Sequence, residues 1–385
     1  MDYRYNPQLL PLAPSASLAL MDKARAMKAQ GLDIISLAGG EPDFDTPAAA
    51  SLAGIGAITA GQTHYTTGRG MPKLRGRIAR KLREENGIPA ETETVLVTPG
   101  AKAAIYCAVR TFMGPGDQVM LLDPAWLSYE AIVVASGGEA VHVPLDFEDG
   151  YRIREELLEA AVTPRCKMLI LNTPNNPTGR VLTREEAEIL GAFAQKHDLM
   201  ILADEIYEKI LFEGTHLSMA AMPGLAERVI TVNGFSKCAA MTGWRLGYLT
   251  GPKEVVDRIY LLYQHIFSCV PEFVQEAGLV ALDMPEAVAE MTESYRVRRD
   301  SFLAKLQTLP GFRCIVPEGA FYAWAKVDRD AEEMADFLLR EAGVVTVPGG
   351  AYGENSRDCI RMCFAADPAD LENAIIRMEK ALRGA

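Results

Sequence analysis

The amino-acid sequence predicts an α/β fold in which helices flank a mostly parallel sheet. Short, almost continuously apolar runs recur through the middle of the chain, and helical patterns lie between them. Glycine-rich, proline-rich or polar segments follow most of these runs. Strands that are buried on both faces have such continuous apolar runs, and strands that alternate with helices form parallel sheets.

Seven of the apolar runs are expected to form the strands of this sheet. They are residues 94–98, 118–122, 140–143, 167–171, 199–203, 229–232 and 246–250. The most clearly marked helix between them spans residues 183–196, because Thr183 and Glu186 have the spacing of a capping box. Apolar residues then recur on one side of this segment at helical spacing, as in a helix that packs against a sheet.

After about residue 280 the pattern changes. Residues 284–308 indicate one long charged helix, and strand-like stretches follow at 321–327, 344–347 and 359–364, before a closing helix at 368–382. This mixture predicts a smaller α+β unit. The N-terminal segment precedes the sheet pattern and ends in a turn at residues 39–42, so we expect it to pack with this smaller unit.

Length and charge limit the possible classes of partner. The chain has 385 residues, of which 49% are hydrophobic and 23% charged, as in a globular protein with at least two packed units. Its 39 basic and 51 acidic residues give a net charge of −12, which repels nucleic-acid phosphates and anionic lipids. We therefore expect neither nucleic acid nor a membrane as a partner, although a local basic pocket for a small anion is compatible with this charge.

The cysteines and the N-terminal segment favour a cytoplasmic protein. Seven cysteines are dispersed without CxxC spacing, which fits a reducing compartment better than a disulfide framework. Cys359 and Cys363 could be imagined as metal ligands, but the histidines are scattered and HExxH is absent, so no metal site is expected. Residues 1–27 lack the basic region of a signal peptide, and the uncharged run 46–68 is too polar to span a bilayer.

Small and polar residues follow five of the predicted strands, at residues 100–102, 124–126, 175–179, 204–207 and 235–237. The carboxyl ends of parallel strands share one edge of a sheet, where ligands bind, so we expect these segments to converge on one crevice. Each segment also has an ordinary structural interpretation, such as a turn, a helix cap or a solvated lysine. The occurrence of all five in this order favours a binding site.

The residue types at this edge distinguish between classes of cofactor. Neither GxGxxG nor GxxxxGK[ST] occurs, which disfavours a dinucleotide dehydrogenase or a P-loop enzyme. A lysine, an aspartate, an aromatic residue, an arginine and a helix N-terminus are instead the groups that pyridoxal phosphate (PLP) requires. The lysine forms a Schiff base with the aldehyde, and the carboxylate keeps the pyridine nitrogen protonated. The helix N-terminus and the arginine hold the phosphate.

Seven motifs occur in order along nearly the whole chain: GEPDF at 40–44, YTTGRGMPKLR at 65–75, NNPTG at 175–179, DEIY at 204–207, SK at 236–237, MTGWRLGY at 241–248 and RMCF at 361–364. This set resembles the class I/II (fold type I) aminotransferases, nearest the bacterial aspartate aminotransferases of the gamma subgroup. The resemblance implies a large PLP-binding domain at residues 46–283 and a small domain from residues 1–45 and 284–385. It also implies ping-pong transamination between an L-amino acid and a 2-oxo acid.

The resemblance further implies a role for each residue around the cofactor ring. Lys237 would hold the cofactor and later move the α-proton of the substrate, and Asp204 would pair with the pyridine nitrogen. Tyr207 and Asn176 would form hydrogen bonds to the 3-oxygen of the ring. Trp126 would stack on the ring and border the substrate.

At the phosphate, the resemblance implies contacts from the backbone amides of Gly100, Ala101 and Lys102, together with the Arg245 side chain. A tyrosine that matches Tyr65 reaches the phosphate of the neighbouring subunit in this family, so the resemblance implies a homodimer with shared sites. Many relatives carry a phosphate-binding serine three residues before the lysine. This chain has Gly234 there, which leaves one phosphate contact open, and Ser236 is the adjacent hydroxyl.

For the substrate, the resemblance implies that Arg361 binds the α-carboxylate, with Gly40 and Asn176 completing that pocket. In aspartate-specific relatives a lysine that matches Lys102 faces the distal carboxylate, so we expect aspartate and 2-oxoglutarate as substrates. An arginine, alanine or aromatic aminotransferase, or a C–S lyase of the same fold, remains an alternative. A transcription regulator with an aminotransferase-like domain would carry a basic winged-helix segment upstream, which we do not expect here.

Overall fold

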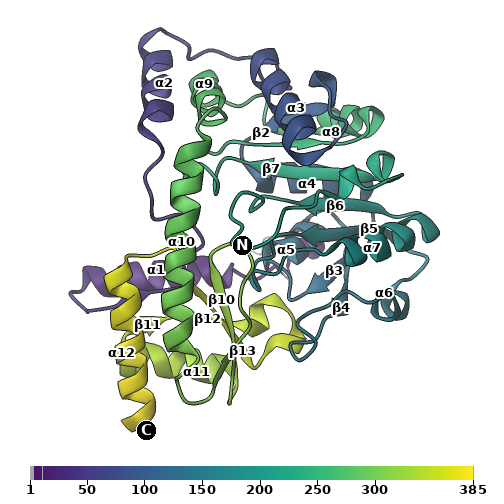
Figure 1. Ribbon diagram of the computed structural model, residues 1–385. Coiled ribbons are helices and arrows are strands. Elements are labelled where there is room, and N and C mark those ends of the chain that lie inside the picture. Colours follow the sequence, from purple (N-terminus) through teal and green to yellow (C-terminus); the bar gives the residue numbers. More distant parts are fainter. Residues whose placement is uncertain (1–3, 11, 385) are drawn as a thin grey trace.

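A seven-stranded sheet forms the centre of the larger part of the molecule (Figure 1). The computed structural model describes residues 4–10 and 12–384 and gives the strand order β2-β8-β7-β6-β5-β3-β4. The strands are β2 (Val95–Thr98), β3 (Gln118–Asp123), β4 (Glu139–Pro144), β5 (Cys166–Asn172), β6 (Met200–Asp204), β7 (Val229–Gly234) and β8 (Gly247–Thr250). β8 runs antiparallel to β2 and β7, and the other neighbouring pairs are parallel. The prediction of a mostly parallel seven-stranded sheet is confirmed.

Helices cover both faces of this sheet, and alternate strand residues face opposite sides. In β5, Met168 and Ile170 pack towards α4 (Ala101–Phe112), α5 (Ser128–Ala135) and α8 (Lys253–Ile266). Leu169 and Leu171 pack towards the other face. The helices that contribute to that face are α3 (Pro72–Asn86), α6 (Glu155–Ala161), α7 (Arg184–Lys196) and α9 (Glu272–Ala281).

Two local predictions have different outcomes in this layer. The capping box at the start of α7 is confirmed, because Thr183 Oγ1 accepts from the Glu186 N–H at 3.2 Å while Glu186 Oε2 accepts from the Thr183 N–H at 3.0 Å. The prediction that residues 140–143 are buried on both faces is wrong. In β4 only Val143 is buried, since this strand lies at the edge of the sheet and pairs with β3 alone.

A second, antiparallel sheet has the strand order β12-β13-β10-β9. Its strands are β9 (Phe312–Cys314), β10 (Tyr322–Val327), β12 (Val347–Pro348) and β13 (Cys359–Cys363), and the neighbouring helices are α10 (Pro285–Leu306), α11 (Ala331–Phe337) and α12 (Pro368–Gly384). From the N-terminal segment, β1 (Ile35–Ser36) pairs in parallel with β11 (Val344–Val345). The expected single strand at 344–347 is therefore wrong, because β11 and β12 belong to different sheets. The domain boundaries at 45/46 and 283/284 stay a prediction.

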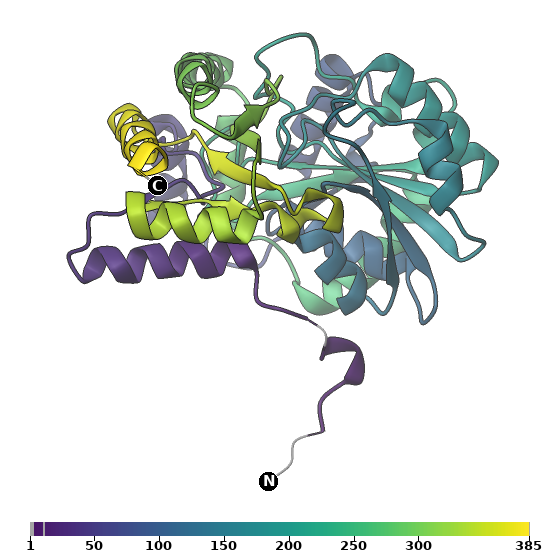
Figure 2. The same cartoon turned by 90° about the horizontal axis from the view of Figure 1, so that it is seen from below.

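The remaining helices lie at the periphery. α1 (Ala16–Ala29) lies outside the second sheet and contacts β1 and β12 (Figure 2), and α2 (Ala48–Thr59) packs against α9 (Figure 1). Short 3-10 helices occur at Pro7–Leu9, Thr92–Thr94, Met219–Ala221, Ala226–Arg228, Gly349–Tyr352 and Glu354–Ser356, and a π-helical turn at Leu338–Ala342. Among the residues that the structure describes, no helix combines the length and the apolar character needed to cross a membrane.

Candidate active site

A cavity of about 410 Å³ lies at the carboxyl ends of the parallel strands. All five segments that were predicted to converge there line it or adjoin it, and the second sheet adds a further wall. Of the predicted site residues, those that line the cavity are Gly40, Ala101, Lys102, Trp126, Asn176, Asp204, Tyr207, Lys237, Arg245 and Arg361. Gly100 directly precedes this set at the start of α4. Tyr65, which is 89% exposed, lies outside the cavity of its own chain.

The turn before α4 has the features of an anion site. Gly100 has φ +84°, and a Cβ there would lie 2.5 Å from Arg245 Nη2, so only glycine lets the guanidinium approach this closely. Arg245 itself has φ 54°, an unusual value for a long side chain, and such strain concentrates at functional sites. No side chain caps the first turn of α4. Its free N–H groups and Arg245 can therefore hold a phosphate.

Two glycines bring β7 and β8 close to this turn. A Cβ on Gly247 would lie 2.6 Å from the backbone nitrogen of Ala101 and 2.7 Å from the carbonyl carbon of Gly100. A Cβ on Gly234 would lie 3.0 Å from the Gly247 Cα. A serine at position 234 would thus crowd β8. Ser236, two residues further along the chain, lines the cavity.

Lys237 follows the end of β7, and its Nζ donates to the carbonyl oxygen of Gly40. Burial lowers the pKa of Lys237 to about 8. At neutral pH a minor fraction of this amine is therefore unprotonated, a far larger fraction than for an ordinary lysine. An unprotonated lysine amine is the form that attacks an aldehyde.

Asp204 is the last residue of β6 and is 3% exposed. Its Oδ2 accepts a hydrogen bond from the Tyr129 hydroxyl at 2.7 Å, and its Oδ1 accepts from the Ile206 N–H at 3.3 Å. Burial raises the pKa of Asp204 to about 6 despite these two hydrogen bonds. A buried carboxylate in this state is stabilised by a cationic ligand group. Tyr129 was not predicted from the sequence, in which no motif marks it.

Arg361 lies on β13 and is 2% exposed. Its Nη1 donates to Asn176 Oδ1 at 3.1 Å and its Nη2 to the Ala38 carbonyl at 2.8 Å. The ring of Tyr322 lies 4.5 Å from the guanidinium, and the Tyr322 hydroxyl is 2.7 Å from that of Tyr207. Within the described chain no carboxylate pairs with Arg361, so this buried cation is suited to an anionic substrate group.

The sequence analysis missed one wall of the cavity. α1 and the residue before it contribute Ser15, Ser17, Leu18, Met21 and Arg25. β10 of the second sheet also contributes Tyr322. These residues belong to no motif that we recognised, and only the packing of both chain ends against the larger sheet brings them to the site.

Behind Asp204 lies a buried polar cluster in which Glu205, Glu208 and His216 offer ligand atoms within 4.8 Å of one another. Lys81 forms an ion pair with Glu208, and His216 Nε2 is 2.8 Å from Glu205 Oε2. These contacts supply the compensating positive charge within the protein. The expectation that the protein has no metal site stays a prediction.

The residues at the cavity fit PLP. The uncapped α4 N-terminus and Arg245 suit its phosphate, the buried Asp204 suits a protonated pyridine nitrogen, and Lys237 has the lowered pKa that bond formation to its aldehyde requires. The seven-stranded sheet with such a site at its carboxyl edge is the arrangement of fold type I PLP-dependent enzymes.

Comparisons with known proteins agree with this assignment to the PLP-dependent enzymes. The model of the family "Aminotransferase class I and II" matches residues 32–378. The chain is 42% identical to an aspartate aminotransferase of Musicola paradisiaca, over 91% of this chain and 90% of that protein, and 38% identical to an arginine–pyruvate transaminase of Pseudomonas aeruginosa, over 92% of each. The solved structure of Thermus thermophilus aspartate aminotransferase with maleate superposes with a TM-score of 0.95 at 37% identity, covering 99% of this chain and 100% of that one. The chain therefore belongs to the class I and II aminotransferases and is a PLP-dependent enzyme.

The close approach of β8 to the phosphate turn leads to a first prediction. We expect Gly247→Ala to displace the turn at Gly100 and Ala101 and to raise the Kd of PLP roughly tenfold or more, about 1.4 kcal/mol. Titration of the folded apoprotein with PLP by absorbance measures this. Gly243→Ala is the matched control, because a Cβ there meets nothing within 4 Å. Equal affinity in both variants would contradict the assignment of Gly247 to the turn.

Proposed function

We propose that this aminotransferase transfers the amino group of L-aspartate to 2-oxoglutarate. Besides Lys237 and Arg245, which would contact the cofactor, and Arg25, which pairs with Asp22, the cavity contains two basic residues, Arg361 and Lys102. The position of Lys102 carries the proposal. Lys102 lines the cavity in the first turn of α4, with its Nζ 4.9 Å from the centre of the Trp126 ring. Burial, and then the neighbouring Arg245, lower the pKa of Lys102, which indicates a partly desolvated ammonium rather than a solvated one. Two cations match the two carboxylates of aspartate.

The relatives support a dicarboxylic substrate. The Musicola paradisiaca protein is named an aspartate aminotransferase, and the Thermus thermophilus structure contains maleate, a four-carbon dicarboxylate. Here Arg361 would bind the α-carboxylate with Gly40 and Asn176 at its side. Lys102 would bind the distal carboxylate.

The remaining residues would act on the bound cofactor and the substrate proton. PLP supplies an electron sink that stabilises negative charge at the substrate α-carbon. Lys237 would hold the cofactor and, once the substrate amine has replaced it, would accept the α-proton at its Nζ and deliver it to the cofactor carbon. Asp204 would keep the ring nitrogen protonated. Tyr207 and Asn176 would hold the 3-oxygen of the ring.

Contacts to the face of the ring and to the phosphate would orient the cofactor. Trp126 would stack on the ring, and the backbone amides of Gly100, Ala101 and Lys102 would bind the phosphate together with Arg245. Because Arg245 lies against Gly100, the guanidinium and the helix N-terminus can act on one anion.

We also propose a cytoplasmic homodimer in which Tyr65 reaches the phosphate site of the partner. Tyr65 is exposed and does not line the cavity of its own chain. α2 presents Leu52, Ile55 and Ile58 to solvent, an apolar strip that is typical of an interface.

A second candidate donor is arginine. Glu41 also lines the cavity, where it accepts a hydrogen bond from Thr242 Oγ1 at 3.0 Å, and its carboxylate could bind a guanidinium. The Pseudomonas aeruginosa relative is named an arginine–pyruvate transaminase. Repulsion between arginine and Lys102 weighs against this donor.

Lys102 provides the test of substrate class. We expect Lys102→Ala to lower kcat/KM for aspartate roughly tenfold to a hundredfold, since it removes the cation for the distal carboxylate, and to change kcat/KM for alanine far less. Steady-state kinetics with a panel of donors measures the ratio. Lys102→Met keeps the bulk and the backbone amide, so an equal effect of this control on aspartate assigns the loss to charge. A uniform loss across donors, or a wild-type preference for arginine, would exclude the aspartate proposal.

Lys237 gives a prediction about attachment of the cofactor. Borohydride reduction of the holoenzyme should fix PLP to Lys237, as read by peptide mass spectrometry. Because only the neutral amine attacks the aldehyde, the rate of attachment to the apoenzyme should rise with pH through a midpoint near 8. Lys237→Ala should retain PLP binding without transamination. Labelling of another lysine would show that the assignment is wrong.

The shared site can be tested by mixing two inactive variants. A heterodimer of Lys237→Ala and Tyr65→Ala subunits contains one site that has both the lysine and the tyrosine. Activity should therefore return on mixing, towards a quarter of the wild-type value for random exchange of dimer subunits. Sedimentation velocity must show a dimer at micromolar concentration, and a monomer would exclude the shared site.

A further inference from the structure

Among the described residues, Tyr129 is the one side-chain donor to the carboxylate of Asp204. The hydroxyl of Tyr129 lies 2.7 Å from Asp204 Oδ2, and the only other hydrogen bond to this carboxylate within the described chain is the longer one from the Ile206 N–H. Asn172 Nδ2 donates to the backbone carbonyl of Asp204 at 2.9 Å and so fixes the main chain rather than the carboxylate. The orientation of the carboxylate therefore depends chiefly on Tyr129.

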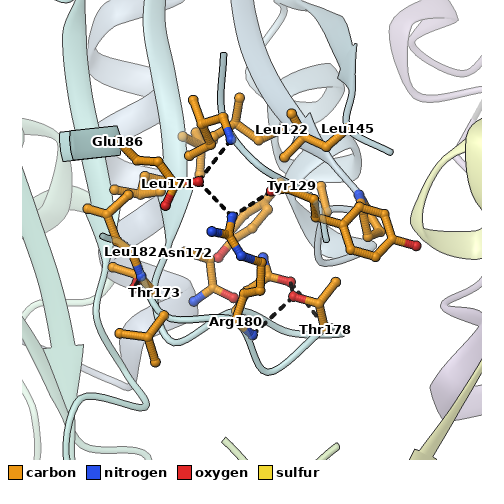
Figure 3. Close-up of a pocket in the computed structure, with 17 residues that line it drawn as sticks. Leu122, Tyr129, Leu145, Leu171, Asn172, Thr173, Thr178, Arg180, Leu182 and Glu186 are labelled. Carbon is orange, nitrogen blue, oxygen red and sulfur yellow. Dashed lines mark hydrogen bonds and ion pairs between the residues drawn. The ribbon is translucent and has the colours of Figure 1, made fainter. Parts of the chain in front are cut away.

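Tyr129 is itself held rigidly. It lies in the first turn of α5, and its backbone N–H donates to the Trp126 carbonyl at 2.9 Å. Its ring meets that of Trp126 edge to face at 5.2 Å. On the side away from the active site, Tyr129 and Asn172 border a second, small cavity of about 40 Å³, which also contains the ion pair of Arg180 and Glu186 (Figure 3). Tyr129 thus forms part of the wall between the two cavities.

In the hydrogen bond between Tyr129 and Asp204, the phenol donates and the carboxylate accepts. Burial, followed by the charge of Asp204, raises the pKa of Tyr129 well above its usual value, so the phenol stays protonated and donates. The other titratable groups facing Asp204 are Glu205, whose charge disfavours the carboxylate form, Lys237, whose charge favours it, and Tyr207. Tyr129 is the strongest of the groups that favour the ionised carboxylate.

We propose that Tyr129 is a positioning residue that keeps Asp204 ionised and directed at the pyridine nitrogen, and thereby sets the acid limit of PLP binding. The inference rests on the role proposed above for Asp204. The hydrogen bond from Tyr129 to Asp204 also determines the direction in which the acid limit should shift when the hydroxyl is removed. Loss of the phenol donor makes the carboxylate easier to protonate, and a neutral carboxyl group no longer pairs with a pyridinium. Binding should then be lost at a higher pH as the solution is acidified.

The test uses Tyr129→Phe, which keeps the ring between the two cavities. The pH dependence of the Kd of PLP for the apoenzyme reports ionisation of the unliganded protein, and we expect its acid midpoint to rise by roughly one pH unit, a tenfold loss of affinity below it. Nitrogen-15 NMR with ring-labelled PLP should show a smaller protonated fraction of the pyridine nitrogen in the variant. Tyr263→Phe is the matched control, since Tyr263 is buried and its hydroxyl has no hydrogen-bond partner among the described residues.

A second substitution should shift the acid midpoint of PLP binding in the opposite direction. Site-specific 3-fluorotyrosine at position 129 is a more acidic phenol and a stronger donor, so it should lower the acid midpoint, and it keeps the test informative if Tyr129→Phe does not fold. If the acid midpoint of PLP binding in both Tyr129→Phe and the 3-fluorotyrosine protein equals that of Tyr263→Phe, the inference is overturned. An unprotonated ring nitrogen in the wild-type holoenzyme at every pH would instead contradict the role of Asp204. The two failures are therefore distinguishable.

Discussion

The parallel register of β5, β6 and β7 is the constraint on which the rest of the site depends. Asn172 lies opposite Asp204, so β5 and β6 end together, and Asp204 lies opposite Val232, two residues before the end of β7. A slip of one residue would turn Asp204 to the other face of the sheet. The segments after these strands carry Asn176, Tyr207 and Lys237, and they reach one cavity because the parallel strands that support them end at the same edge of the sheet.

Burial of charge at this edge gives the cavity its chemistry. Asp204, Lys237 and Arg361 are desolvated, and none of them forms an ion pair with another side chain among the described residues. Uncompensated charges in such surroundings are costly to the protein alone. The pyridine nitrogen and aldehyde of PLP would supply partners for Asp204 and Lys237, and the carboxylate of an amino-acid substrate would supply one for Arg361. Binding of PLP should therefore stabilise the fold as well as equip the enzyme.

The second sheet completes the site with residues that are far away in the sequence. Arg361 on β13 contacts Asn176 of the larger sheet and the backbone at Ala38, so a single side chain joins three parts of the chain. Tyr322 on β10 extends this connection to Tyr207. Such contacts span more than a hundred residues of sequence and form only when both sheets have folded and packed. The cavity is thus lined by residues of both sheets and is complete only where the two sheets meet.

The sequence by itself determined the strands, the capping box of α7 and the motif residues from Gly40 to Arg361, because each depends on local pattern or on a short motif. It did not show that β4 is an edge strand, that residues 344–347 divide between two sheets, or that Tyr129, Tyr322 and α1 border the site. Those features depend on which segments become neighbours. Neighbours are selected by packing over the whole chain, and an apolar run or a tyrosine has the same local pattern whether it lies at an edge, in the core or against a carboxylate.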